Sequence, residues 1–459
     1  MANVLTVTST TSTPRPTLWQ SVRGELRPLI GLAVPLIAGL ASSTAISLTD
    51  TYFIGALGEL PLAAASLTSS VILILYASLY GFLYPISILV GQAFGAGEVH
   101  KIASVLRHGL VLGLGIGVLG AVLMGVGLLL LPHAGQPPEV VAIIAPYWVM
   151  MALLLIPYCV SLVYKQVFDA IEKPWTGVGL TLIAVIINVP LTWILTSGQF
   201  GVPALGLFGA GLASFAATLI GLLITALYFQ FAPALAPYRL RSDWRRSEFA
   251  EQVREGTPMA FQYLLEGGAV TVAGILIGWL GATALAANQI VFSVASVLYM
   301  IPLGMAGAVS IRIAQSVGGD ERGRLRGIGA AGVGLVVLWT AVMTIALATM
   351  GERIARIFVA EADVIGIAGL MFLVVGLMQV FDGVQSVSLG ALRGMLDSRW
   401  PTLVSLIAYW LIALPLSWAL GFPLGLGAPG VWGGFGFGLL IAAFLLWRRF
   451  HRNTEVMHG

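Results

Sequence analysis

Charged side chains are the scarcest feature of this chain. Only 9% of its 459 residues are Asp, Glu, Lys or Arg, whereas 58% are hydrophobic, and the mean hydropathy is +0.96. Soluble domains carry about 25% charged residues, so this composition lies far outside soluble-protein usage. The sequence therefore predicts an integral membrane protein.

Cysteine and catalytic motifs are also nearly absent. Cys159 is the single cysteine, which excludes an intramolecular disulfide and a thiolate metal cluster. The chain has no Gly-x-x-x-x-Gly-Lys, HExxH or GxSxG pattern, and we expect all five histidines in loops or the tail. These absences remove the signals of an ATPase, a zinc protease or a serine hydrolase, so we predict no enzyme and no cofactor.

Long apolar runs, by contrast, are abundant. Runs of about twenty residues predict helices rather than a β-barrel, whose strands need only about ten alternating residues. Residues 1–20 are rich in Ser and Thr and lack an apolar core, so we expect a disordered tail and no cleavable signal peptide there. Twelve spans are predicted, at residues 28–57, 62–91, 105–131, 140–163, 176–197, 206–231, 257–280, 284–317, 327–349, 365–391, 401–420 and 430–447.

Basic residues are distributed unequally about these spans. With a cytoplasmic N-terminus, 21 of the 23 Lys and Arg fall inside, and only Arg353 and Arg356 fall outside. The positive-inside rule then predicts an even number of spans with both termini cytoplasmic. The basic residues form no continuous face, so no nucleic-acid partner is expected. Short loops and the lack of an Asn-x-Ser/Thr acceptor favour the inner membrane of a bacterium.

The chain contains its opening block twice. Residues 35–98 and 258–321 align without a gap at an offset of 223 with 18 of 64 positions identical, and Gln92 matches Gln315 while Gly95 matches Gly318. Each copy has six spans, which is an even number, so both enter the membrane from the same side. The pseudo-twofold axis then runs along the membrane normal, as in transporters with parallel repeats.

This duplication predicts the architecture. The expected fold is an all-α integral membrane protein with 12 transmembrane helices in two pseudo-symmetric six-helix lobes, and rocking of the lobes about a central cleft is the basis of alternating access. The expected parts are a cytoplasmic tail (1–27), an N-lobe (28–232), a cytoplasmic linker (233–256), a C-lobe (257–450) and a second cytoplasmic tail (451–459).

Three carboxylates lie well inside predicted spans: Asp50, Glu266 and Asp382. A charge at mid-membrane costs at least about 2.5 to 3.5 kcal/mol, so each needs a reason. Counting along the helices from Arg254 and Arg393 puts Glu266 and Asp382 at a similar depth, where they can share one site. Asp50 lies in the outer half of the first lobe and is expected to form a separate site.

An intramembrane carboxylate without a basic partner either takes a proton or binds a cation. We therefore expect proton or cation coupling at these residues, with Na⁺ held at Glu266 and Asp382 as one option. The alternative is a permanently protonated carboxyl that bonds to a neighbouring hydroxyl, such as Thr49 or Thr51 beside Asp50.

Amides and aromatic rings are the secondary candidates. Amides in apolar runs more often join helices than contact ligands, but Asn188 faces Ala413 in the other copy, which favours a functional role. Aromatic rings beside a carboxylate suit a lipophilic cation. Those near the C-lobe carboxylates in sequence are Tyr263, Phe261, Phe292, Tyr299, Phe372 and Phe381.

Several short motifs together resemble the multidrug and toxic compound extrusion (MATE) transporters, over about residues 25–450. They are Leu48-Thr-Asp-Thr51, Gly91-Gln-Ala-Phe-Gly-Ala-Gly97, Pro258 followed by Glu266, Ala287-Asn-Gln289, Pro302 through Ser310-Ile-Arg-Ile313, Phe381-Asp-Gly383 and Leu392-Arg-Gly394. Within that family the chain is similar to the NorM-like branch.

The resemblance implies roles for individual residues. Glu266, Asp382 and Asp50 stand at the family's carboxylate positions, and Asn188 stands at the first of two asparagines in the fifth span. Thr192 replaces the second asparagine, which weakens an N-lobe ion site built from both amides. The expected coupling residues are Glu266, Asp382, Asp50 and Asn188, and the expected substrate contacts are Gln289, Asn288, Phe381, Tyr263 and Thr192.

The implied activity is export of lipophilic, mostly cationic compounds, driven by H⁺ or Na⁺. The protein is expected to be a monomer, and its other partners are membrane lipids. The alternative is a lipid-linked oligosaccharide flippase of the same superfamily, which is expected to line its cleft with cations. A membrane-embedded enzyme lacks a metal or nucleophile constellation here, and a channel needs no rocking lobes.

Overall fold

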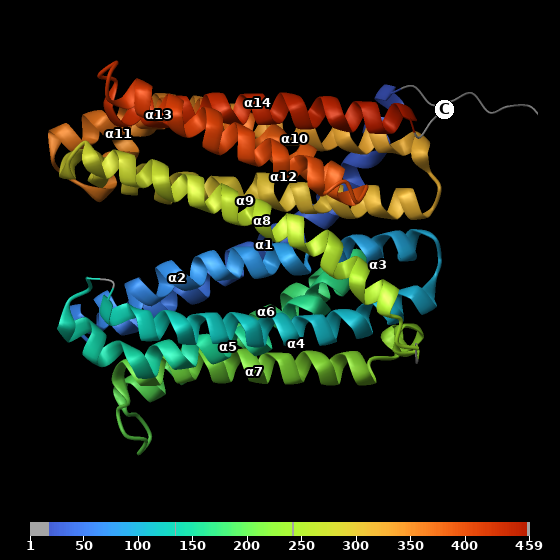
Figure 1. Cartoon of the computed structure of the whole chain (residues 1–459), viewed down its shortest axis with the longest axis horizontal. Coiled ribbons are helices and arrows are strands. Elements are labelled where there is room, and N and C mark those ends of the chain that lie inside the picture. Colours follow the sequence, from blue (N-terminus) through green and yellow to red (C-terminus); the bar gives the residue numbers. More distant parts are fainter. Residues whose placement is uncertain (1–17, 134, 241–242, 457–459) are drawn as a thin grey trace, which may run out of the picture.

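The computed structural model describes residues 18–133, 135–240 and 243–456, and within these ranges it is built of helices without a strand. Twelve helical segments are long and apolar enough to cross a membrane. They run side by side along one long axis (Figure 1). The predicted twelve-span all-α architecture is confirmed.

The first six segments form the N-lobe, in which α2 and α3 together make the second segment. The helices are α1 (Leu18–Gly55), α2 (Glu59–Leu83), α3 (Pro85–Gly95), α4 (Val99–Leu130), η1 (Leu131–His133), α5 (Pro138–Ala170), α6 (Pro174–Ser197), α7 (Gly206–Phe231) and η2 (Pro233–Arg239).

The last six segments form the C-lobe, in which α12, η4 and α13 together make one segment and η4 is a π-helix. The helices are α8 (Arg246–Trp279), α9 (Ala282–Gly318), η3 (Arg322–Arg324), α10 (Leu325–Phe358), α11 (Ala362–Gly394), α12 (Arg399–Ser405), η4 (Leu406–Ala413), α13 (Leu414–Gly421) and α14 (Gly427–Val456).

The repeat is visible in the first turn of each lobe. Gly58 between α1 and α2 has φ +113°, and Gly281 between α8 and α9 has φ +112°. Residues with a side chain rarely adopt this backbone conformation, so both copies of the turn require glycine. The same turn chemistry therefore closes the first helical hairpin of both lobes.

Two helices begin against the opposite lobe. The first part of α1 packs against α9 and α10, where Leu29 and Leu32 join a buried cluster with Met305 and Val309. The first part of α8 packs against α2. Each repeat thus sends the start of its first helix across the interface between the lobes.

Several helices extend by more than a turn beyond the predicted spans. α1 begins at Leu18, well before residue 28, and α14 continues to Val456, past residue 447. The helices extend beyond their apolar parts because polar contacts hold the extra turns, such as the ion pair of Arg326 with Glu455 at 3.1 Å. Of the tail predicted to be disordered, residues 1–17 lie outside the described residues and the rest belongs to α1.

The expectation that all histidines lie in loops or the tail is also wrong. His108 lies within α4 and is fully buried. Its Nδ1 contacts Ser104 O at 2.8 Å, and its Nε2 accepts a hydrogen bond from Arg245 N at 3.1 Å. The ring also packs on Trp244, with centroids 4.4 Å apart. These contacts attach the linker before α8 to the N-lobe. No local sequence motif predicts them.

One end of the helix bundle carries most of the arginines, among them Arg312, Arg324, Arg393 and Arg399, and we call it the arginine end. There α3 crosses α9 at very short range, because a Cβ atom on Gly95 would lie 1.9 Å from Gln315 O and one on Gly318 would lie 1.9 Å from Gln92 O. These four residues are the repeat pairs noted in the sequence. The crossing is therefore self-complementary, like the interface of a symmetric dimer.

Side-chain hydrogen bonds repeat the same symmetry. Gln92 Nε2 donates to Gly394 O at 3.3 Å, and Gln315 Nε2 donates to Ala170 O at 3.0 Å. Gly394 ends α11 and Ala170 ends α5, which are equivalent helices of the two lobes. Each lobe thus contributes one glutamine that binds the end of a helix in the other lobe.

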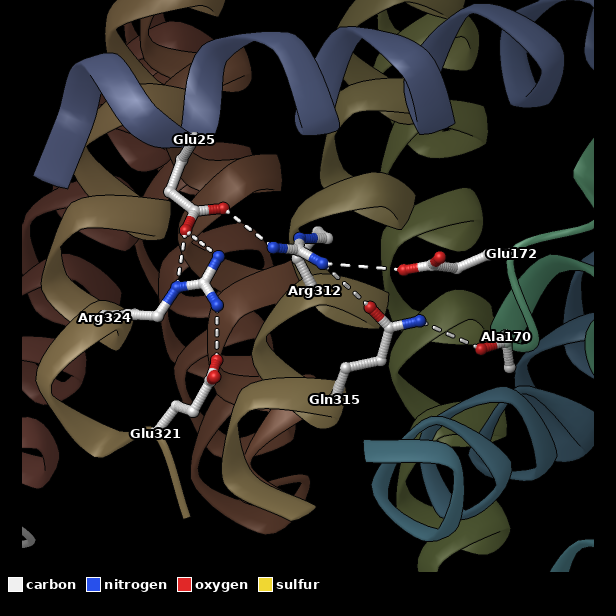
Figure 2. A network of polar contacts seen from close by, with 7 residues as sticks. All are labelled: Glu25, Ala170, Glu172, Arg312, Gln315, Glu321 and Arg324. Carbon is white, nitrogen blue, oxygen red and sulfur yellow. Dashed lines mark hydrogen bonds and ion pairs between the residues drawn. The ribbon is translucent and has the colours of Figure 1, made fainter. Parts of the chain in front are cut away.

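An ion-pair network is added to this symmetric contact on one side. Figure 2 shows Arg312 between Glu25 and Glu172, with Arg324 beyond Glu25. The Arg312 guanidinium is 3.1 Å from Glu25 and 3.6 Å from Glu172, and Arg324 is 2.6 Å from Glu25. Leu89 occupies the position equivalent to Arg312 in the first copy, so the network has no counterpart there in the part of the chain that the structure describes.

Candidate functional site

A cavity of about 1030 Å³ opens in the C-lobe and is lined mostly by apolar side chains. Along α8 its wall runs from Tyr263 to Trp279, which ends at the α8–α9 turn. The cavity therefore faces away from the arginine end. Four residues of the wall belong to α2, so the N-lobe supplies part of the lining: Ser70, Leu73, Ile74 and Ala77.

Two carboxylates face this cavity, Glu266 from α8 and Asp382 from α11. Both are half-buried. Tyr299 lies beside Asp382, and its hydroxyl is 2.7 Å from Ser386 Oγ. None of the ion pairs formed by the described residues involves Glu266 or Asp382. The pair is thus available for a cation that enters the cavity.

Three of the five expected substrate contacts lie in the cavity wall: Asn288, Gln289 and Tyr263. Asn288 Oδ1 accepts a hydrogen bond from Trp432 Nε1 at 2.8 Å, so this amide also joins α9 to α14. Gln289 is exposed to the cavity. Phe381 packs against the C-lobe core instead, because one step along a helix turns a side chain about 100° away from Asp382.

The wall contains aromatic residues that the sequence did not single out, including Tyr409, Trp432 and Phe435. Tyr409 lies in the π-helical segment η4, and its ring stacks on Phe435 with centroids 5.7 Å apart. Such π-helical segments frequently occur at functional sites. Pro415 lies in α13, directly after the π-helix, and it removes a backbone donor there, so this proline is a sequence signal for the irregular helix.

Asp50 forms a second polar site, in the N-lobe. Its carboxylate accepts hydrogen bonds from Ser214 Oγ at 2.9 Å and from Thr192 Oγ1 at 3.4 Å. Asn188 Nδ2 donates to Ser214 Oγ at 3.2 Å, whereas Asn188 Oδ1 is buried without a partner among the described residues. The oxygens of α1, α6 and α7 therefore converge here, and Thr192 belongs to this cluster rather than to the C-lobe cavity.

Thr49 and Thr51, the sequence neighbours of Asp50, play no part in this cluster. Their hydroxyls donate to the carbonyls of Ala45 and Ser47, one turn back in α1, at 2.9 and 2.8 Å. The sequence does not indicate the role of Ser214, because a serine in an apolar helix gives no sign of which residue it will contact in the fold.

These features define a class of protein: a multi-pass membrane transporter with two parallel six-helix repeats and a polar site in each lobe. The family model described as MatE matches residues 35–194 and 258–419 of this chain. The chain belongs to the MatE family.

The relatives agree in length as well as in sequence. A Synechococcus sp. protein named "Probable multidrug resistance protein NorM" is 33% identical over 95% of this chain and 96% of its own length. A protein of the same name from Rhizobium meliloti is also 33% identical, over 93% of both chains. The predicted NorM-like resemblance is confirmed.

Solved structures share the fold at lower identity. The MATE transporter VcmN of Vibrio cholerae in its bent form has a TM-score of 0.83 and 22% identity, and the match covers 95% of this chain and 98% of that one. A Pyrococcus furiosus transporter of the MOP superfamily has a TM-score of 0.86 and 17% identity, with 97% and 100% covered.

Proposed function

We propose that this protein exports lipophilic, mostly cationic compounds in exchange for H⁺ or Na⁺. The observation that carries the proposal is the pair of carboxylates, Glu266 and Asp382, which two helices bring to one largely apolar cavity. The apolar wall suits the body of a lipophilic compound, and the carboxylates suit its charge. The names of the relatives, which refer to multidrug resistance, support export of varied compounds.

Competition for the same negative charge would couple the two fluxes. A proton or Na⁺ at Glu266 and Asp382 removes the charge that a cationic compound needs, and a bound compound excludes the ion. If each occupant favours a different orientation of the lobes, binding of one drives release of the other. Asp50, with Asn188 as its neighbour, is a second place where an ion can act on the N-lobe.

Alternating access then follows from the two lobes, 28–232 and 257–450, as the rocking units. The arginine end is the cytoplasmic side in this proposal, because basic residues collect there. The C-lobe cavity opens toward the other end, and the contact of α3 with α9 closes the arginine end. Reversal requires that contact to separate.

The flippase alternative receives less support. A pyrophosphate-linked lipid needs cationic side chains along its path, and no Lys or Arg is present among the described residues of the cavity wall. The wall instead carries two carboxylates, which would repel a pyrophosphate.

Extrusion of ethidium tests the proposal. The chain is expressed in an efflux-deficient bacterial host, and ethidium fluorescence is followed while Na⁺ and pH gradients are imposed separately. We expect one of the two gradients to drive extrusion, and Glu266→Gln and Asp382→Asn each to reduce the rate at least tenfold, because each removes a charge that the ion and ethidium share. If both variants extrude ethidium at the rate of the parent protein, the site assignment is wrong.

A further inference from the structure

Arg393, in the last turn of α11, is a cation buried at the inner limit of the C-lobe cavity. Its guanidinium donates to Tyr263 Oη and to Gln262 Oε1, both at 3.1 Å. It also lies over the rings of Tyr263 and Tyr84, at 4.7 and 5.2 Å from their centroids. Tyr263 itself belongs to the cavity wall, so the charge of Arg393 lies directly behind a residue of that wall.

The two hydrogen bonds place Arg393 close to Glu266. Gln262 and Tyr263 precede Glu266 by four and three residues in α8, which puts all three on one face of that helix. The guanidinium therefore lies about one helical turn, roughly 5 to 6 Å, below the level of Glu266. No ion pair or hydrogen bond joins Arg393 to Glu266 among the described residues, but at this separation in a buried setting the two opposite charges attract each other. Asp382 precedes Arg393 by eleven residues, or about 16 Å along α11.

The other charged groups of this region are already balanced. Asp169, which is buried near Tyr84, is paired with Lys165 at 2.7 Å. Tyr299 and Tyr409, which face the two cavity carboxylates, are neutral phenols. This leaves two carboxylates and one guanidinium, since arginine stays charged in proteins. With both carboxylates ionised, the site carries one net negative charge.

We propose that Arg393 sets the charge capacity of the cavity: it balances one of the two carboxylates, so the site accepts one positive charge and selects monovalent lipophilic cations over divalent ones. This inference rests on the proposed function of the cavity. A second positive charge on the occupant would have no free counter-charge in an apolar environment, where an unbalanced charge is costly. Without Arg393, the site would accept two positive charges.

Binding of two matched probes tests this assignment. The probes are tetraphenylphosphonium, with one charge, and an alkyl-bridged bis(triphenylphosphonium), with two. Their dissociation constants are measured on the full chain purified in detergent, for the parent protein, Arg393→Gln and Arg393→Lys. The parent protein is expected to prefer the monovalent probe. In Arg393→Gln the preference should shift at least about tenfold toward the divalent probe, and in Arg393→Lys, which keeps the charge, it should be retained.

The outcomes separate this inference from the proposed function. If Arg393→Gln has the preference of the parent protein, Arg393 does not set the capacity. A parent protein that prefers the divalent probe overturns the inference without any variant, which decides the matter even if Arg393→Gln does not fold. If the parent protein binds neither probe, the proposed function fails and this inference falls with it.

Discussion

Asp50 is held by neutral hydroxyls that come from two distant helices. Thr192 and Ser214 donate to it from α6 and α7, and this arrangement satisfies a carboxylate without neutralising its charge. A role in ion coupling therefore depends on that charge, whereas a structural role depends only on the hydrogen bonds. The two roles predict different results for an isosteric substitution.

Asp50→Asn is that substitution. We expect ethidium extrusion to fall about tenfold or more while the thermal unfolding midpoint in detergent changes little, because the amide can still bond to both hydroxyls. Ser214→Ala is the matched control, since it removes one hydrogen bond of typically about 1 kcal/mol and keeps the charge. If Ser214→Ala lowers extrusion as much as Asp50→Asn does, the role of Asp50 is structural.

For single residues, the sequence predicted which charged side chains belong to the site better than it predicted their hydrogen-bond partners. Glu266 and Asp382 could be found because a carboxylate in an apolar run is costly and therefore stands out. The sequence places Arg393 at the membrane boundary, and only the folded chain shows it buried and bonded to Tyr263. Hydrogen-bond partners such as Ser214 depend on which helix faces turn together, and apolar helices carry little periodicity that could show this.

Among the elements, the crossing of α3 and α9 depends most strongly on residue size. Gly95 and Gly318 each face a backbone carbonyl of the partner helix at a separation that leaves no space for a methyl group. A side chain there must push the helices apart. Since these helices come from different lobes, the displacement would loosen the closed arginine end.

Gly95→Ala is expected to lower the stability of this state by about 1 to 3 kcal/mol, the usual cost of overpacking. The measurement is the thermal unfolding midpoint in detergent, which should fall. Gly334→Ala in α10 is the control, because a Cβ there has no neighbour within 4 Å and alanine favours a helix. A midpoint for Gly95→Ala that matches the one for Gly334→Ala would mean that the crossing is not tight.

For the whole molecule, the closed end combines symmetric and asymmetric contacts. The two glutamine hydrogen bonds and the glycine crossing repeat in both lobes, whereas the Arg312 network exists on one side only (Figure 2). Arg312 is largely buried, so its ion pairs are less screened than surface pairs. Its loss should therefore favour opening at this end.

Arg312→Ala is expected to lengthen and broaden the distance between spin labels on Glu98→Cys in the N-lobe and Arg399→Cys in the C-lobe, measured by pulsed electron paramagnetic resonance. Cys159 is fully buried and does not compete for the label. Arg356→Ala serves as control, because its pair with Glu352 is exposed and contributes little. Identical distance distributions for all three proteins would remove Arg312 from the closure.

The arrangement of the lobes was predictable because an even-numbered repeat fixes the axis, and the span count was predictable because lipid requires long apolar helices. The crossing of α1 and α8 to the opposite lobe was not predictable. Leu29 looks like any lipid-facing leucine in the sequence, and only its contacts with Met305 and Val309 place it in the C-lobe core.

In the proposed exchange, a coupling ion and a cationic compound exclude each other at Glu266 and Asp382. The most direct test counts ions released when tetraphenylphosphonium binds to the purified protein, with a pH indicator in weak buffer for H⁺ and an ion-selective electrode for Na⁺. We expect about one ion to be released per bound probe, and no release and much weaker binding in the Glu266→Gln, Asp382→Asn double variant. Undiminished binding to that variant, or binding to the parent protein without release of either ion, would contradict it.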